Sequence, residues 1–152
     1  MDEIDVKILK SLKANARENA SVISDHVGMS VSAVIERIRK LENSGLISRH
    51  TTILDNKKAG KDVTAFMFVT LEHPKYIDRF TAFVRENREI LECHYITGDS
   101  DFILKIVTDT TQTLERLLND VKSVSGVMST RTIVNLSTVK EEYSVDPEEL
   151  LK

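Results

Sequence analysis

Two helical patterns separated by a short break at Gly28 are the feature that most constrains this chain. After the break, apolar residues recur at spacings of three and four, which makes one stripe along a helix. These residues are Val31, Val34, Ile35, Ile38 and Leu41. Ser30 is a suitable N-cap for that helix, and Gly45 stands where a C′ glycine ends it. Together with a shorter helical segment at residues 21–27, the pattern predicts a helix-turn-helix.

The segments around the helix-turn-helix complete a small domain. Residues 4–16 carry another apolar stripe at helical spacing, and Asp2 precedes it as a suitable N-cap. The stretch LISRHTTIL, residues 46–54, is rich in β-branched residues and predicts a strand or wing. The polar stretch DNKKAGKD, residues 55–62, predicts a connection. We therefore expect a winged helix-turn-helix domain over residues 1–60, including the linker strand.

The remaining residues, 61–152, predict a sheet with two helices. Strands are expected over four β-branched or apolar runs, at 63–72, 90–97, 102–107 and 127–139. Helices are expected where apolar residues recur at helical spacing, at 77–88 and 113–124. The order β-α-β-β-α-β is the ferredoxin-like arrangement, so the expected fold class is α+β. Both helices would cover one face of the sheet, and a second copy of the chain is the simplest cover for the other.

The charge distribution also separates the two domains. The net charge of the chain is −3, which counts against a phosphate-binding surface over the whole molecule. Residues 1–60, however, hold 10 Lys and Arg against 8 Asp and Glu, whereas residues 61–152 hold 11 against 16. The first domain therefore carries +2 and the second −5. This asymmetry favours a polyanion as a partner of the first domain only.

The outer face of the predicted helix that follows Ser30 holds the candidates for DNA contact. They are Ser30, Ser32, Ala33, Glu36, Arg37, Arg39 and Lys40. Ser32, Ala33 and Glu36 are the candidates for base edges, because serine donates or accepts, alanine contacts a thymine methyl group, and glutamate accepts from cytosine. The three cations are expected to contact phosphates. The alternative is an ordinary solvated helix face, on which Glu36 and Lys40 pair at i,i+4.

The long motif IDVKILKSLKANARENASVISDHVGMSVSAVIERIRKLENSGLIS resembles the N-terminal domain of the Lrp/AsnC family of bacterial and archaeal transcription regulators. The stretches ECHYITGDSDFILKI and STRTIVNL resemble its second domain, so the resemblance covers essentially the whole chain. It implies a winged helix-turn-helix that binds double-stranded DNA, joined to a ferredoxin-like domain that senses amino acids. It also implies a homodimer that assembles further, with an octamer as one outcome.

The same resemblance implies which residues of the second domain hold a small effector. They are Gly98, Asp99 and Asp101 in the loop, Thr111 at the start of the following helix, and Ile133, Val134 and Asn135 in the last strand. Glycine lets the backbone approach a ligand closely, free loop amides suit a carboxylate, and aspartate suits an ammonium group. An amino acid carries both of these groups. The alternative is that Gly-Asp-Ser-Asp, residues 98–101, is only a hairpin turn.

Several positions depart from the family pattern. Arg49 and His50 stand where Gly-Tyr is frequent, which adds charge near the expected wing. Ser100 stands where an aromatic residue is common in the loop, and Asn135 stands where an apolar residue is common. We therefore expect a more open or more polar pocket, whose effector should not be copied from that of the best-known members.

The sequence carries no catalytic, metal or membrane signature. The four histidines have no i,i+4 pairing, Cys93 has no second cysteine, and no Gly-rich phosphate loop or nucleophile elbow is present. We therefore expect no enzyme activity, metal or cofactor. The absence of an apolar run near the ~18 residues of a membrane span, and an acidic N-terminus unlike a signal peptide, predict a cytoplasmic protein.

Two other functions remain open at this point. One is an architectural DNA-binding protein that packages or bends DNA without an effector. The other is an amino-acid-sensing module that acts on a protein partner. Binding to a DNA fragment, and the response of that binding to amino acids, would distinguish these functions from an effector-controlled regulator.

Overall fold

The computed structural model describes residues 1–151 and divides the chain into two compact units. The helical unit is formed by Met1–Ile53 together with Lys140–Lys152. The sheet unit is formed by Leu54–Val139. This division differs from the expected domains, 1–60 and 61–152, at both ends. Neither the connection after residue 53 nor the C-terminal segment carries a hydrophobic period from which its tertiary contacts could be predicted.

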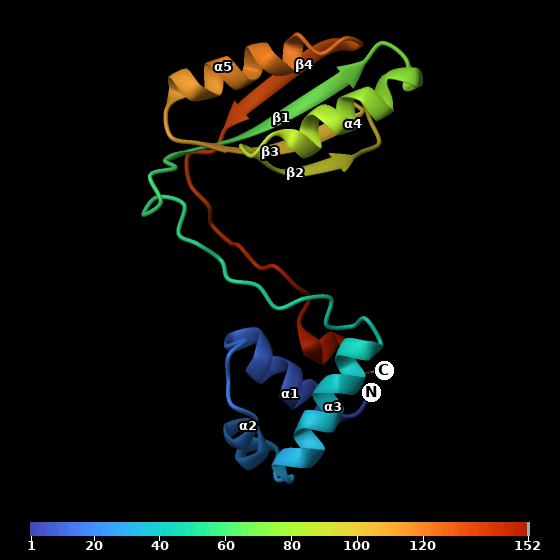
Figure 1. Ribbon diagram of the computed structural model, residues 1–152, viewed down its shortest axis with the longest axis vertical. Helices are drawn as coiled ribbons and strands as arrows, with labels where there is room; N and C mark the ends of the chain where they lie inside the picture. The colour runs from blue at the N-terminus through green and yellow to red at the C-terminus, as the bar shows by residue number, and fades with distance from the viewer. Residues whose placement is uncertain (152) are drawn as a thin grey trace. The chain divides into compact units, whose positions relative to one another are not determined.

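Three helices build the helical unit (Figure 1): α1 Glu3–Ala14, α2 Ala20–Val27 and α3 Val31–Asn43. Asp2 and Asp5 form a capping box at the start of α1, in which each carboxylate accepts from the backbone N–H of the other residue. Gly28 ends α2 with φ +69°, a left-handed conformation that glycine adopts without strain. Ser30 then caps α3. The predicted helix-turn-helix is therefore confirmed.

Apolar residues from all three helices form the core of the helical unit. Ile8 of α1, Ile23 of α2 and Val34 of α3 have no exposed surface, and Leu41 is buried with them. Burying one such side chain contributes about 1.5–3 kcal/mol relative to leaving it exposed. The inner part of the α3 stripe thus faces the other helices, so the opposite face of α3 is left to solvent.

The C-terminal segment packs on α1 within the helical unit. Pro147 is buried at the start of a short 3-10 helix, η2 Pro147–Leu150. Lys10 of α1 pairs with Glu148, and Lys13 Nζ lies 3.1 Å from a carboxylate oxygen of Glu142. These contacts explain why the residues after Val139 group with the helices rather than with the sheet.

Residues 46–54 form no strand, contrary to the expectation of a strand at this place. Among residues 1–151, none of the four strands of the sheet pairs with this segment. Its two last side chains, Ile53 and Leu54, expose 55% and 70% of their surface. A β-branched composition favours extended backbone, but a strand also needs a neighbour to satisfy its hydrogen bonds.

The sheet unit has the chain order β-α-β-β-α-β (Figure 1). Its strands are β1 Val63–Leu71, β2 Ile90–Tyr95, β3 Phe102–Thr108 and β4 Val127–Val134. The short 3-10 helix η1 and the helices α4 and α5 occupy Pro74–Tyr76, Ile77–Glu86 and Thr111–Lys122. The strands lie in the order β2-β3-β1-β4, and every neighbouring pair is antiparallel. The predicted ferredoxin-like α+β fold is therefore confirmed.

Alternation along β1 separates the two faces of the sheet. Met67 has no exposed surface and belongs to one core with Phe80 of α4 and Leu117 of α5. Both helices therefore lie on one face of the sheet, as Figure 1 shows. Phe66 and Phe68 alternate with the buried residues and stay partly exposed on the other face. Neither α4 nor α5 of the sheet unit covers that second face.

Candidate functional site

The N-terminal turn of α3 presents small polar groups to solvent. The hydroxyl groups of Ser30 and Ser32 lie 3.1 Å apart and share a hydrogen bond. Ser30 Oγ also accepts from the backbone N–H of Ala33 at 3.3 Å, which is the N-cap bond of the helix. Ser32 is exposed, and Ala33 is partly exposed. This end of α3 therefore offers hydroxyl groups, a methyl group and the positive end of the helix dipole.

One turn further along α3, Glu36 and Lys40 form the i,i+4 ion pair that is typical of a solvated helix face. Lys40 Nζ lies 3.0 Å from Glu36 Oε1, and both side chains are more than two-thirds exposed. The hydrogen bond from Lys40 lowers the pKa of Glu36 below its ordinary value. Exposed pairs of this kind contribute little to stability, so the pair opens readily for a stronger partner. Both side chains therefore remain accessible to a ligand.

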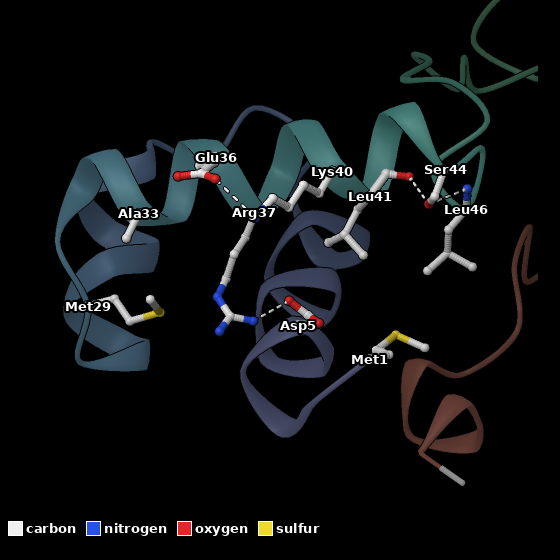
Figure 2. Close-up of a pocket in the computed structure, with 10 residues that line it drawn as sticks. All are labelled: Met1, Asp5, Met29, Ala33, Glu36, Arg37, Lys40, Leu41, Ser44 and Leu46. Atoms are coloured by element: carbon white, nitrogen blue, oxygen red, sulfur yellow. Dashed lines mark hydrogen bonds and ion pairs between the residues drawn. The ribbon is translucent and has the colours of Figure 1, made fainter.

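The two arginines of α3 have different surroundings. Arg39 is exposed and has no hydrogen bond or ion pair among residues 1–151. Arg37 instead extends toward the start of α1, where Nη1 donates to Asp2 Oδ2 at 2.8 Å and to Asp5 Oδ1 at 2.7 Å. Figure 2 shows the guanidinium group reaching Asp5. The bonds to Asp5 and Asp2 raise the pKa of Arg37 above its ordinary value.

A groove of about 470 Å³ lies along the flank of α3 that carries Arg37 (Figure 2). Ala33 and Arg37 line it from α3, together with Met29 from the turn, Leu46 from the segment after α3, and Asp5. The capping-box spacing of residues 2 and 5 is a sequence signal for carboxylates at the start of α1. No sequence pattern, however, predicts that Arg37 reaches them or that Met29 and Leu46 complete the groove.

In the sheet unit, Asp101 fastens the loop between β2 and β3 to the end of β1. Its backbone N–H donates to the carbonyl oxygen of Val69 at 2.9 Å, and its carbonyl oxygen accepts from the N–H of Ile96 at 2.8 Å. Its carboxylate Oδ2 accepts from the backbone N–H of Leu71 at 2.7 Å. These three bonds give Asp101 a structural role in the turn.

The preceding loop residues are more open than Asp101. Gly98 and Asp99 are exposed, and Gly98 has φ +113°, which favours glycine. The Thr70 hydroxyl donates to the carbonyl oxygen of Asp99 at 3.3 Å, while the Asp99 carboxylate has no partner among residues 1–151. The loop therefore keeps one unpaired carboxylate at a place where the backbone is accessible.

The other predicted effector residues lie at the opposite end of the sheet. Ile133 and Val134 end β4, and both are about half exposed. The backbone N–H of Asn135 donates to the carbonyl oxygen of Thr64 at 2.8 Å, near the start of β1. Thr111 begins α5, shortly after β3 ends opposite the start of β1. Asp101 binds at the last residues of β1, so the two groups are separated by roughly 20 Å at about 3.3 Å per strand residue.

Among residues 1–151, no cluster of His, Cys, Asp and Glu side chains is suited to a metal ion, and no helix is long and apolar enough to span a membrane. Burial raises the pKa of the Cys93 thiol above its ordinary value, which makes the reactive thiolate scarcer.

Comparison with known proteins addresses both units. A family model described as the Lrp/AsnC ligand binding domain matches residues 64–145. A second model, described as winged helix-turn-helix DNA-binding, matches residues 1–48. The first match alone covers more than half of the chain.

Individual relatives match over nearly the full length. The HTH-type transcriptional regulator FL11 of Pyrococcus horikoshii is 36% identical over 141 residues, which cover 93% of this chain and 93% of that protein. The leucine-responsive regulatory protein of Salmonella typhimurium is 33% identical over 144 residues, which cover 93% of this chain and 88% of that protein. A transcriptional regulator from Neisseria meningitidis, solved in complex with L-Met, has a TM-score of 0.94 at 26% identity and covers 99% of both chains.

Proposed function

Because the chain belongs to the Lrp/AsnC family of transcription regulators, we propose that α3 binds DNA and that an amino acid held by the sheet unit controls this binding. The observation that carries the proposal is the exposed N-terminal face of α3, a helix that is separated from α2 by only three residues, 28–30. In a helix-turn-helix, this part of the second helix enters the major groove. The protein would act in the cytoplasm and without catalysis.

We assign base contacts to Ser32, Ala33 and Glu36, with Ser30 beside them at the cap. Their hydroxyl, methyl and carboxylate groups can distinguish base edges in the major groove. Arg39 is the first candidate for a phosphate contact, because it is exposed and has no partner among residues 1–151. Lys40 is the second, once it leaves Glu36.

A second copy of the chain is the proposed cover for the open face of the sheet. That face carries Phe66 and Phe68, and the Arg131 guanidinium group lies 4.4 Å from the ring centroid of Phe68. A sheet with aromatic side chains on an uncovered face gains stability from a second layer. Two copies would also present two α3 helices about one DNA turn apart, so that each weak half-site gains affinity from its twin. Further assembly of such dimers is part of the proposal.

The proposed effector site lies where copies of the chain meet. Gly98 and Asp99 lie at one end of the sheet, whereas Thr111 and residues 133–135 lie at the other, so a pocket that uses both groups needs two copies. The loop amides suit the carboxylate of an amino acid, and the exposed Asp99 carboxylate suits its ammonium group. One relative is named as leucine-responsive, and another was solved with L-Met. An amino acid is therefore the proposed class of effector here, and it would alter assembly and DNA affinity reciprocally.

The test combines DNA binding with an amino-acid screen on the full chain. Wild-type protein is incubated at low salt with a random-sequence duplex library, and the enriched duplex is then titrated by fluorescence anisotropy. Each proteinogenic amino acid at millimolar concentration is screened for a rise in melting temperature, because a ligand at 100 times its Kd raises the free energy of unfolding by about 2.7 kcal/mol. An amino acid that raises the melting temperature should also change DNA affinity or oligomer size.

Each alternative function has its own outcome in this test. Failure to enrich any duplex at low salt would overturn the DNA-binding role and leave a module that acts on a protein partner. Enrichment without any amino-acid effect on affinity or oligomer size would favour the architectural role. The many internal bonds of Asp101, which reduce the polar groups left for a ligand, are the observation on the side of the architectural role.

A further inference from the structure

We propose that Arg37 is a positioning residue for DNA recognition, which fixes how α3 presents its base-contacting face, and not a phosphate contact. This role rests on the proposed function of α3 as the recognition helix. Arg37 lies on the flank of α3 that faces the start of α1, and its side chain is only 27% exposed. Its main partner, Asp5, is 16% exposed, so the pair is largely removed from solvent.

The two carboxylates that bind Arg37 are also held in place by backbone hydrogen bonds. Asp2 Oδ1 accepts from the backbone N–H of Asp5 at 2.8 Å, and Asp5 Oδ2 accepts from the backbone N–H of Asp2 at 3.1 Å. This capping box uses one oxygen of each carboxylate and leaves the other oxygen to Arg37 Nη1. The guanidinium group therefore binds a rigid pair of acceptors at the first turn of α1.

Arg37, Asp2 and Asp5 form one charged cluster, and its charge disfavours a phosphate contact at Arg37. One guanidinium group faces two carboxylates, so the cluster has a net charge of −1 at neutral pH. A DNA phosphate would have to replace a partly buried, charge-assisted hydrogen bond of 2.7 Å to Asp5 and an exposed one of 2.8 Å to Asp2 while it approached two anions. Arg39 on the same helix has no bond to exchange within residues 1–151, so its guanidinium group is available to a phosphate.

The cluster adds directional hydrogen bonds to the apolar packing of α3. The shared apolar core that includes Ile8 and Val34 holds α1 and α3 together, but hydrophobic contact is not directional and tolerates small rotations of a helix. Hydrogen bonds from Arg37 are directional, and Arg37 stands next to Glu36 and one turn after Ala33. The cluster therefore fixes the rotation of α3 about its axis, which sets where the base-contacting side chains point.

The experiment compares two duplexes, the one that wild-type protein enriches from a random library and a scrambled duplex of the same composition. The specificity ratio is the affinity for the first divided by that for the second, and the salt slope is measured on the scrambled duplex. For Arg37→Gln we expect the specificity ratio to fall about tenfold, comparable to losing one base contact, with an unchanged salt slope. Arg39→Ala is the control, for which we expect similar losses on both duplexes and a slope reduced by about one.

Two further variants separate positioning from a general loss of folding. Asp5→Asn keeps the charge of Arg37 but weakens its anchor, so we expect the specificity ratio to fall as it does for Arg37→Gln. The exchanged pair Asp5→Arg with Arg37→Glu should recover part of the ratio relative to either single change, because it restores the ion pair with reversed sign. Circular dichroism at the assay temperature checks that each variant is folded.

Three results of these binding measurements would overturn the positioning role of Arg37. If Arg37→Gln reduces the salt slope by about one and leaves the specificity ratio unchanged, Arg37 is a phosphate contact and the proposal is overturned. If the exchanged pair recovers none of the specificity ratio relative to Asp5→Arg alone and Arg37→Glu alone, the ion pair does not position α3, which overturns the proposal as well. Absence of any DNA binding by wild-type protein would instead overturn the function of α3 itself, and the positioning role with it.

Discussion

The carboxylate of Asp101 accepts a 2.7 Å hydrogen bond from the backbone N–H of Leu71, thirty residues earlier in the chain. The ladder between β1 and β3 ends at the pair Val69 and Phe102, and the register between β1 and β4 shifts between Thr70 and Leu71. Asp101 therefore satisfies a backbone donor that the ladder with β3 does not reach. Its role differs from that of Asp99, although the two belong to one Gly-Asp-Ser-Asp motif.

We expect Asp101→Ala to destabilise the sheet unit, because the N–H of Leu71 loses its acceptor. The expected decrease in the free energy of unfolding is about 1–3 kcal/mol, the cost of leaving a partly buried donor unsatisfied. Asp101→Asn should cost less, because an amide oxygen can still accept. Urea unfolding of the three proteins measures the difference.

Asp99→Ala is the matched substitution at the other aspartate of the same loop. Because the Asp99 carboxylate is exposed and unpaired among residues 1–151, the free energy of unfolding should stay within about 0.5 kcal/mol of wild type. The response of DNA binding to the amino acid found in the screen should be lost. An unchanged response to that amino acid would remove Asp99 from the effector site.

Local and distant interactions were predictable from the sequence to very different degrees. The caps at Asp2 and Ser30 and the turn at Gly28 depend on neighbouring residues, so spacing and residue type were enough to predict them. Arg37 bonds to residues 32 and 35 positions earlier in the chain, and the Asp101 carboxylate bonds to a residue 30 positions earlier. No periodic pattern encodes such contacts.

In the candidate site, too, the contacts of individual side chains could not be predicted from spacing. Spacing predicted which face of α3 is exposed, but it did not distinguish Arg37, which turns inward, from Arg39, which stays outside. The residues assigned to the effector also come from a family pattern, and they lie at two ends of one sheet. A sequence pattern can collect residues that a single chain keeps apart, because it carries no information on how copies assemble.

Gly126 allows a matched test of close packing in the sheet unit. It has φ +93°, and a Cβ atom at this position would lie 2.1 Å from Tyr76 Cγ. We expect Gly126→Ala to lower the free energy of unfolding by about 2–5 kcal/mol, because left-handed strain and a steric overlap add. Gly60→Ala is the control, since Gly60 has φ +75° but open space around it. It should cost only the strain, about 1–2 kcal/mol, and equal losses in urea unfolding would contradict the packing argument.

The cluster of Asp2, Asp5 and Arg37 should make the stability of the helical unit sensitive to acid. The hydrogen bond from the Asp5 backbone, followed by that from Arg37, lowers the pKa of Asp2 below its ordinary value. A carboxylate with a depressed pKa in the folded state stabilises the fold fully above its unfolded pKa, and this stabilisation is lost as the pH falls through the folded value. Asp2→Asn should therefore be less stable than wild type at pH 6, and the gap should close below about pH 4. Thermal unfolding across pH 2–6 measures it, and a gap that stays constant over this range would exclude the contribution of Asp2.

The contact of the C-terminal segment with α1 predicts a loss of stability in a chain that ends at Val139. Such a chain lacks the buried Pro147, whose apolar contact should contribute about 1–2 kcal/mol to the helical unit. Hydrogen exchange should therefore be faster in α1, while the strands of the sheet unit keep their protection. Equal exchange in α1 of both proteins would show that the segment does not stabilise this helix.

High salt distinguishes the apolar part of the contact between the C-terminal segment and α1 from its ion pairs. Glu148→Ala removes the partner of Lys10, whereas Glu149→Ala removes a neighbouring exposed carboxylate that has no partner side chain among residues 1–151. We expect a lower melting temperature for Glu148→Ala only, and the difference should vanish in 1 M salt, where the screening length is about 3 Å. The effect of ending the chain at Val139 should persist in 1 M salt, because burial of Pro147 does not depend on charge. A truncated chain that regains wild-type stability in high salt would assign the whole contact to its ion pairs.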